Sequence, residues 1–249
     1  MKIALSLLFA TLTLAQTPDA GKKPEFEVAS IRPAVDDGGH DADTDKGRFT
    51  THNLTLKRLI AIAYDIDVKQ VLGGPNWTDS DSYDINAKIP EEFAARKQDQ
   101  VPQMLQSLLE DRFKLVVHRE PRQLSGYALV PAKQGPKMAI AKPSENGSDM
   151  HSNNSQAKAR SLTMDQFARY LSRNRDIGKV VVNQTGLTDR FDFELNWMPV
   201  QLDSKPNAAA DDRASIFTAI QEQLGLRLEA AKVQVQAIII DHAEKPEEN

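Results

Sequence analysis

Hydrophobic and polar residues alternate along two stretches of the chain, residues 83–89 and 191–197. The apolar positions are Tyr83, Ile85, Ala87 and Ile89 in the first stretch, and Phe191, Phe193, Leu195 and Trp197 in the second. Successive side chains of a strand point to opposite faces, so this period of two is typical of a half-buried strand. Each stretch is predicted to be a strand with one face on a core.

Apolar residues at helical spacing precede both strands. They are Leu56, Leu59, Ile60 and Ala63 in one segment, and Met164, Phe167, Ala168 and Leu171 in the other. Thr55 and Thr163 can each cap the first turn, and Gln166 completes a capping box with Thr163. Residues 102–111 and 215–224 show the same helical spacing. The pattern predicts four helices, each with one buried face.

The order of these elements suggests an internal repeat. Residues 53–65 resemble residues 161–172 at a constant offset of 108, and residues 71–90 resemble residues 181–199. Each copy continues with its second helix and two apolar stretches, which are predicted to form paired strands, around Pro121 in the first copy. A further strand at residues 26–33 opens the first copy. The sequence predicts an α+β fold with mainly antiparallel sheets, a tandem pseudo-duplication of two β-α-β-β-α-β-β halves.

Composition places the domain boundaries between these copies. The first half is expected at residues 24–134 and the second at residues 161–245, with a short tail at residues 246–249. Residues 135–160 are rich in Gly, Ser, Asn and Lys, which is typical of a linker or long loop, with room for a short strand near residues 138–141. Residues 35–47 and 201–212 are expected to be polar loops.

The first fifteen residues have the layout of a secretory signal peptide. Lys2 precedes an apolar core at residues 3–12, and small residues lead up to a cleavage site after Ala15. Residues 16–23 then read as a flexible polar tail. We expect a protein that is exported to the periplasm or the outside of the cell. Because no apolar run reaches 18 residues, no transmembrane segment is expected in the mature chain.

Charge and cysteine content exclude several classes of protein. The net charge of −4 and the absence of a Lys/Arg block argue against a nucleic-acid partner. The chain has no cysteine, so it can form neither a disulfide framework nor a thiolate zinc site. Motifs for a nucleophile elbow, a zinc protease, a phosphate loop and a dinucleotide fold are also absent. No catalytic residue and no cofactor are therefore assigned.

Several stretches in order carry a family resemblance. They are FEVASIRP, GRFTTHNLTLKRLIAIAYDI, GGPNWTDSDSYDINAKIP, LLEDRFKLVVHREPRQLSGYALV, LTDRFDFELNWMP and IIIDHAEKPEEN. Together they resemble the soil-associated, acidobacterial family of exported proteins that is defined by a domain of unknown function. The resemblance covers about residues 26–246 and implies that some relatives carry this module joined to a membrane metallopeptidase of the antibiotic-sensor type. The order of elements is also similar to the short N-terminal domain of secretins and TonB-dependent receptors, a protein-contact module.

A metal site is one interpretation of the acidic segment at residues 36–48. Asp41, Asp43 and Asp45 alternate as the first ligands of a calcium loop do. The sixth position is Lys46 and the twelfth is His52, so the glycine and the closing glutamate of that loop are missing. A solvated acidic loop is the favoured interpretation, with the metal site as its alternative.

Four residues are candidates for binding. Trp77 and Trp197 are the two tryptophans, and each has an apolar counterpart in the other half, which favours core packing over a stacking surface. Asp79 and Asp189 both follow a threonine in matching turns, where a carboxylate readily accepts hydrogen bonds from the turn backbone. Histidines such as His118 and His242 occupy equivalent strand ends without a visible partner.

The residues favour a non-enzymatic binding or interaction module of the cell envelope, whose partner would be an envelope protein or an extracellular ligand. The alternative is a hydrolase-type enzyme with a carboxylate and histidine site between the two halves. A deep pocket that holds two or more ionisable groups with strongly perturbed pKa values would contradict the binding-module interpretation.

Overall fold

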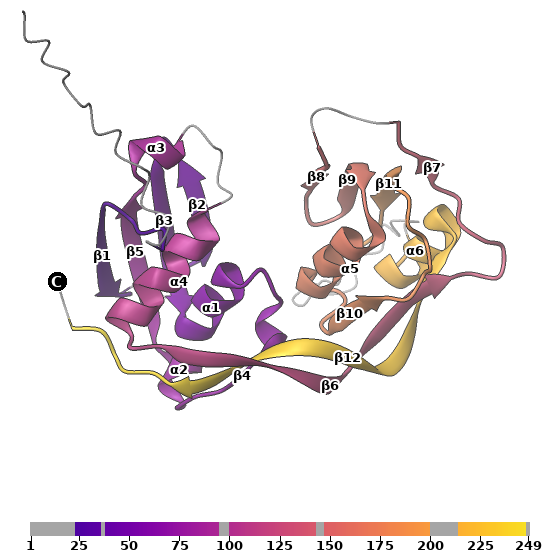
Figure 1. Ribbon diagram of the computed structural model, residues 1–249. Helices are drawn as coiled ribbons and strands as arrows, with labels where there is room; N and C mark the ends of the chain where they lie inside the picture. The colour runs from indigo at the N-terminus through magenta and orange to yellow at the C-terminus, as the bar shows by residue number, and fades with distance from the viewer. Residues whose placement is uncertain (1–22, 36–37, 95–99, 143–146, 200–213, 248–249) are drawn as a thin grey trace, which may run out of the picture.

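The computed structural model describes residues 23–35, 38–94, 100–142, 147–199 and 214–247. These residues form two lobes joined by a long two-stranded ribbon, as Figure 1 shows. The described strands form three four-stranded sheets in which most neighbours are antiparallel. The fold is therefore α+β with mainly antiparallel sheets, as the sequence predicts. The expected signal peptide, nearly all of the N-terminal tail and the loop at residues 201–212 lie outside the described residues.

The first lobe is a four-stranded sheet with two helices packed beside it (Figure 1). In sheet order, its strands are β1 (Val28–Pro33), β5 (Ser82–Lys88), β3 (Arg48–Thr55) and β2 (Asp41–Asp45). Its helices are α1 (Leu56–Ala63) and α4 (Val101–Arg112). Four short elements are η1 (Val68–Gln70), β4 (Val71–Gly73), α2 (Trp77–Ser80) and α3 (Glu91–Ala94). Thr55 caps α1 by accepting a hydrogen bond from the Arg58 amide, so the predicted helix start is confirmed.

The second lobe repeats this plan of one sheet and two helices (Figure 1). In sheet order, its strands are β7 (Ala139–Ile140), β11 (Phe191–Asn196), β9 (Gln156–Leu162) and β8 (Asp149–Ser152). Its helices are α5 (Met164–Arg173) and α6 (Ile216–Leu224). Thr163 and Gln166 form the predicted capping box at the start of α5.

The ribbon consists of β6 (Val116–Pro131) and β12 (Leu226–His242), which are antiparallel. β6 leaves the first lobe after α4, and its far end pairs with β10 (Val180–Asn183) of the second lobe. β12 leaves the second lobe after α6, and its far end pairs with β4 of the first lobe. Each long strand therefore ends beside a short strand of the opposite lobe, and these four strands form the third sheet in the order β10-β6-β12-β4.

The continuous ribbon corrects the predicted strand pairs. The sequence suggests a turn at Pro121, yet this residue lies inside β6 opposite Gln236. The Gln236 carbonyl accepts a hydrogen bond from the Gln70 side chain, so it points away from β6. In an antiparallel pair, residues that face each other either both point their backbone polar groups at the partner strand or both point them away. The nitrogen of Pro121 therefore points away from β12, so no hydrogen bond between the strands is lost by having proline there. The last two predicted strands of each half are therefore one strand.

Two predicted loops also contain strands. The segment at residues 135–160, expected to be a linker or long loop, supplies three strands to the second sheet. β7 lies where a short strand is predicted near residues 138–141, whereas β8 and most of β9 are not predicted. The inward positions of β9 include Ala157 and Ala159, which are too small to give a strong hydrophobic pattern. The polar loop expected at residues 35–47 contains β2, an edge strand whose exposed acidic residues carry no hydrophobic period.

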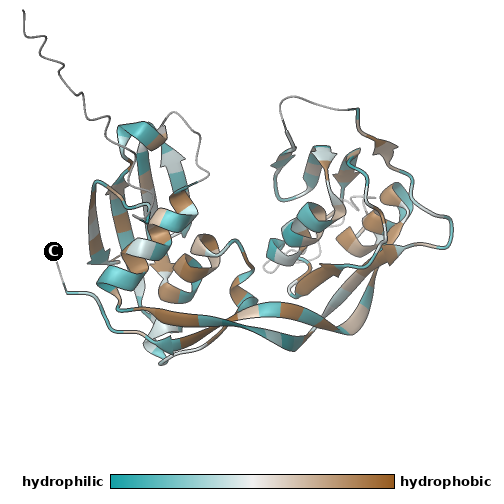
Figure 2. Ribbon diagram, viewed as in Figure 1, coloured by the Kyte–Doolittle hydropathy of each residue, from teal (hydrophilic) through white to brown (hydrophobic). Residues whose placement is uncertain are grey.

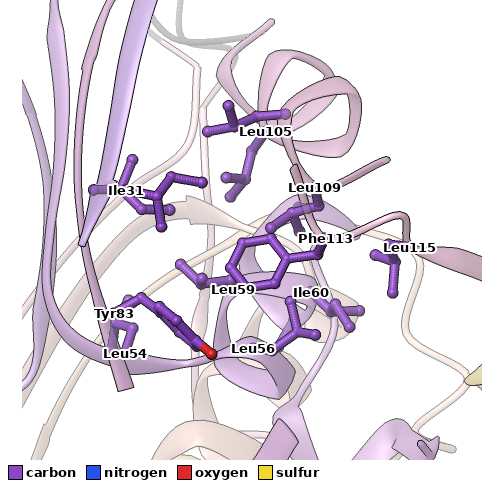
Figure 3. Packing of buried hydrophobic residues seen from close by; sticks show 14 of the residues in the cluster. Ile31, Leu54, Leu56, Leu59, Ile60, Tyr83, Leu105, Leu109, Phe113 and Leu115 are labelled. Atoms are coloured by element: carbon purple, nitrogen blue, oxygen red, sulfur yellow. The ribbon is translucent and has the colours of Figure 1, made fainter. Parts of the chain in front are cut away.

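Each lobe has its own hydrophobic core. In the first core, Leu59 and Ile60 of α1 pack with Leu109 of α4 and with sheet residues, as Figure 3 shows. Phe113 is fully buried at its centre, and its ring meets the edge of Tyr83 at a centroid distance of 5.1 Å. Both cores extend onto the ribbon, because Ile238 of β12 belongs to the first core and Leu129 of β6 to the second. The ribbon therefore ties the cores together.

The lobes share an unusual corner before their first helices. Asn53 and Ser161 both have positive backbone φ angles, of 53° and 51°. The Asn53 amide donates to Asp84 Oδ1 at 2.8 Å, and the Ser161 amide donates to Asp192 Oδ1 at 2.7 Å. Both corners lie where the strand register shifts, so each aspartate replaces a backbone acceptor that the bulge has removed.

Candidate functional site

A groove of about 570 Å³ lies between the two lobes. One side is formed by α1, η1 and the segment between them, and the other side by the end of α5 and the residues that follow it. Figure 1 shows α1 and α5 facing each other above the ribbon. The groove is therefore built from residues that are far apart in the sequence.

The first lobe supplies the apolar lining of the groove. Among the described residues, six aliphatic side chains contribute to it: Ala42, Leu54, Ala61, Ile62, Ile66 and Val68. Figure 2 agrees with this division, because α1 is more hydrophobic than α5. An apolar lining with a few polar groups at its edge is the usual composition of a ligand pocket.

The charged residues of the groove come from both lobes. The cations are Arg58 and Lys69 from the first lobe and Arg173 and Arg175 from the second. The carboxylates are Asp41, Asp65 and Asp67, all from the first lobe. Four cations against three carboxylates make the groove net positive, in a chain whose net charge is −4.

Asp65 joins the lobes directly. Its Oδ1 accepts a hydrogen bond from Arg173 Nη2 at 2.9 Å, and its Oδ2 lies 4.0 Å from Arg169 Nε. Lys69 Nζ makes a second bridge by donating to the Ser172 carbonyl at 3.1 Å. The charged side chains of these bridges, Asp65, Arg173 and Lys69, are at least partly exposed, so each bridge contributes little energy and serves mainly to set the orientation of the lobes.

The backbone explains why Asp65 reaches across the groove. α1 ends in a Schellman-type turn in which the Ile66 amide donates to the Ala61 carbonyl at 3.0 Å. Asp65 occupies the left-handed position of this turn, with φ at 49°. Aspartate tolerates this conformation better than most residues other than glycine and asparagine. The sharp turn ends the helix at the edge of the groove.

Asp67 has a structural role. Its side chain is only 4% exposed and accepts hydrogen bonds from the Lys69 amide and from Lys69 Nζ. The Gln70 side chain in turn accepts a hydrogen bond from the Asp67 amide, which completes a capping box around η1. Asp67 therefore fixes η1, and with it the position of Lys69 on the groove.

Two smaller cavities adjoin the groove. One, of about 400 Å³, shares His40 and Asp41 with it and is also lined by His52 and Asp84. The other, of about 530 Å³, shares Arg173 and Arg175 with it and continues along the second lobe past Tyr170. A ligand in the groove can thus extend toward either lobe.

The two tryptophans that are candidates for binding lie outside the groove. Trp197 is fully buried in the second core, and its Nε1 donates to Asp176 Oδ2 at 2.8 Å. Its ring has no free face for a ligand. Trp77 in α2 is partly buried and stacks on Phe113 at a centroid distance of 6.4 Å. Both rings therefore pack against hydrophobic residues, as predicted from the apolar residues at the matching positions of the other half.

The two candidate aspartates also lie outside the groove, and in different lobes. Asp79 in α2 accepts a hydrogen bond from Lys57 Nζ at 2.6 Å, so its carboxylate holds α2 against α1. Asp189 is exposed just before β11. In this part of each lobe, the hydrogen bonds from backbone amides are instead accepted by Asp84 and Asp192, on the strands that follow these turns.

The acidic segment with Asp41, Asp43 and Asp45 forms one face of β2. Alternate residues of a strand are about 6.6 Å apart along its axis, so these carboxylates are spread out and do not surround one point. Asp43 accepts a hydrogen bond from the neighbouring Thr44 amide, and Asp45 lies 3.5 Å from Lys46. Among the described residues, no group of three or more histidines or acids is arranged to hold a metal ion.

His118 has a partner that the sequence did not reveal. Its Nδ1 lies 2.8 Å from Asp241 Oδ2 across the ribbon, and its Nε2 lies 3.8 Å from Glu120. The hydrogen bond with Asp241 raises the pKa of His118 above its usual value. The contact depends on the pairing of β6 with β12, which brings residues 118 and 241 together. This cluster lies on the ribbon and does not line the groove.

Sequence reasoning missed the groove residues because they do not form a motif. Asp65 and Arg173 are 108 positions apart, and each is an ordinary surface charge next to a helix end. One signal was available: the two residues are 108 positions apart, which is the offset of the repeat predicted from the sequence. Equivalent residues can meet where two similar units face each other.

The architecture defines a two-lobed α+β protein with an open groove between its lobes. The chain belongs to the family described as "Protein of unknown function (DUF3738)", whose model matches residues 57–243 and thus spans both sides of the groove. No curated protein and no solved structure matches it. In the described part of the chain, none of the helices has the length and apolar character needed to cross a membrane.

Proposed function

We propose that this protein is an exported, non-enzymatic binding module of the cell envelope that holds its ligand or partner in the groove between the lobes. The observation that carries this proposal is the groove itself, which combines an aliphatic side from the first lobe with charged residues from both. The cavity volume of about 570 Å³ falls in the usual range for ligand pockets, roughly 300–1,000 Å³.

The described contacts of the ionisable residues favour binding over hydrolysis. In the groove, Asp65 is paired with Arg173 and Asp67 with Lys69, so these carboxylates hold structure. The histidine and carboxylate contacts in the described residues lie elsewhere, at His118, His151 and His242. His40 and Asp41 both line the groove, but in the described part of the chain they make no such contact with each other. A hydrolase would need such a pair beside the substrate.

The internal repeat predicted from the sequence belongs to this proposal. A duplication of one unit accounts for the matching corners at Asn53 and Ser161. It also accounts for Gln123 of β6 lying opposite Gln234 of β12 near the middle of the ribbon. The two copies would then be related by a pseudo-twofold axis, and the groove would lie where they face each other.

Export is supported by the signal-peptide pattern of residues 1–15 and by the resemblance to an exported, soil-associated family. Expression of the full chain in a bacterial host, followed by mass measurement of the protein in the periplasmic fraction, tests this. The expected product begins at Gln16. A product that stays in the cytoplasm with residues 1–15 intact would contradict export.

Site-specific photocrosslinking tests the binding role of the groove. An aliphatic diazirine amino acid would replace Ile62, which lines the groove, or Val28, which is 65% exposed on β1 and serves as the matched control. After incubation with an extract of the native envelope, we expect a discrete adduct at Ile62 only. Filling the groove with Val68→Trp should abolish it. An adduct at Val28 alone, or at neither position, would contradict the proposal.

A further inference from the structure

The charges of the groove point to the chemistry of its ligand, and this inference rests on the proposed binding function. Arg173 is held by Asp65, and Lys69 by Asp67 and the Ser172 carbonyl. Arg58 and Arg175 are exposed, and within the described residues their guanidinium groups have no carboxylate partner. Among its described residues, the groove thus has two cations without a carboxylate partner, one from each lobe.

The two arginines have the chemistry to recognise an anion. A guanidinium group is planar, always charged, and matches a carboxylate or phosphate with two parallel hydrogen bonds. It is also more weakly hydrated than an ammonium group, so removing its water on binding costs less free energy. Asp41 is the remaining groove carboxylate, and it lies at the end shared with the smaller cavity beside His40.

The apolar side of the groove adds a second requirement. Ile62, Ile66 and Val68 offer aliphatic surface to the cavity. A small inorganic anion would leave this surface exposed to water, whereas an apolar body would cover it and gain roughly 25 cal/mol per Å² of apolar area removed from water. The lining is therefore complementary to a molecule that has both an anionic group and an apolar part.

We propose that the groove binds a small anionic amphiphile, a carboxylate or phosphate attached to an apolar body, with its charge held by Arg58 and Arg175. Because the two arginines belong to different lobes, the bound anion adds a bridge to the one already formed by Asp65 and Arg173. Ligand binding then favours the arrangement of lobes that the structure shows.

Three probes with the same apolar body test this proposal: 2-naphthoate, 2-naphthyl phosphate and the neutral 2-naphthamide. Each is titrated into the ¹⁵N-labelled mature chain while the amide shifts of Lys69, Arg173 and Gly178 are followed. We expect saturable shifts of these amides with the anionic probes and at least roughly tenfold weaker binding of the amide, as for the loss of one charge-assisted interaction. The two anionic probes decide between a carboxylate and a phosphate.

Variants identify the residues that read the charge. Arg58→Gln and Arg175→Gln should each weaken binding of the better anion roughly tenfold and leave the affinity for 2-naphthamide unchanged. Arg160→Gln, an exposed charge on β9 outside the groove, is the control and should leave both unchanged. An unaltered amide spectrum away from the groove shows that each variant is folded.

The outcomes separate this inference from the proposed function. If 2-naphthamide shifts the groove amides with the same affinity as the anions, or if both arginine variants bind the anions normally, the anion proposal is wrong and the binding groove stands. If none of the three probes shifts the groove amides, both the anion proposal and the assignment of the groove as a small-molecule site are overturned.

Discussion

In the first lobe, α1 ends in a left-handed turn at Asp65 that leads into an aliphatic segment. In the second lobe, α5 ends in Arg173 and continues through Asn174 to Arg175. The two helices begin alike, with a threonine cap after a bulged corner, so the difference lies at the ends that face the groove. The starts of the helices therefore maintain the fold, while the residues at their ends line the groove.

The contact between Asp65 and Arg173 shows what the difference between the two helix ends achieves. The two residues are 108 positions apart, the offset of the proposed repeat, and they contact each other. If both positions held aspartate, two carboxylates would repel each other across the groove. With an aspartate on one side and an arginine on the other, the contact becomes attractive. Opposite charges at the two helix ends thus connect the two lobes.

The largest effect that we predict in this comparison concerns the attachment of the second lobe to the ribbon. A Cβ atom on Gly126 of β6 would lie 2.5 Å from the Val180 carbonyl oxygen and 2.6 Å from Val233 Cγ2. Backbone cannot yield at that distance, so Gly126→Ala should lower the free energy of unfolding by about 1–3 kcal/mol. Urea denaturation followed by circular dichroism measures it.

Gly39→Ala is the matched control, because no atom lies within 4 Å of its added Cβ and its φ angle is not positive. It should change stability by no more than about 1 kcal/mol, in either direction. Equal stability of the two alanine variants would show that β10 does not pack on Gly126 as described.

The next effect tests whether the two corners are equivalent. Asp84→Ala and Asp192→Ala each leave a backbone amide without its acceptor, at Asn53 and Ser161 respectively. Each should lower the free energy of unfolding by about 1–3 kcal/mol. Asp189→Ala, an exposed control, should change it by less than about 0.5 kcal/mol. A loss at only one of the two corners would break the comparison between the lobes.

A smaller effect is expected for the bridge across the groove. A double-mutant cycle of Asp65→Asn and Arg173→Gln, measured by chemical denaturation, should give a coupling energy of about 0.2–1 kcal/mol, since both side chains are more than half exposed. Asparagine keeps the left-handed backbone of residue 65 without strain. Additive effects of the two substitutions would mean that the lobes are not held by this pair.

The smallest effect on stability concerns the ribbon and its dependence on pH. The hydrogen bond with Asp241 raises the pKa of His118 above 6.5. Protonated His118 therefore stabilises the fold below about pH 6.5, and this contribution is lost as the pH rises through the raised value. NMR titration of the His118 ring should show the raised pKa, and Asp241→Asn should bring it back down. An identical titration in both proteins would rule out the contact.

The sequence predicted the elements that depend on local chemistry. Thr55 and Thr163 cap the expected helices, and the alternation at residues 83–89 gives β5. The predictions failed where the structure depends on pairing between segments that are far apart in the sequence. Pro121 is accepted in the ribbon because its nitrogen faces outward, and β9 is buried although its inward positions are mostly alanines. The candidate site was out of reach for the same reason, since the groove exists only once the ribbon has placed α1 opposite α5.

A ligand in the groove should touch both lobes at once. Intermolecular nuclear Overhauser effects between the ring protons of bound 2-naphthoate and the protein measure this. We expect contacts to the methyl groups of Ile62 and Val68 in the first lobe and to Gly178 in the second, all of which line the groove. Contacts confined to one lobe, or to a surface outside the groove, would contradict this expectation.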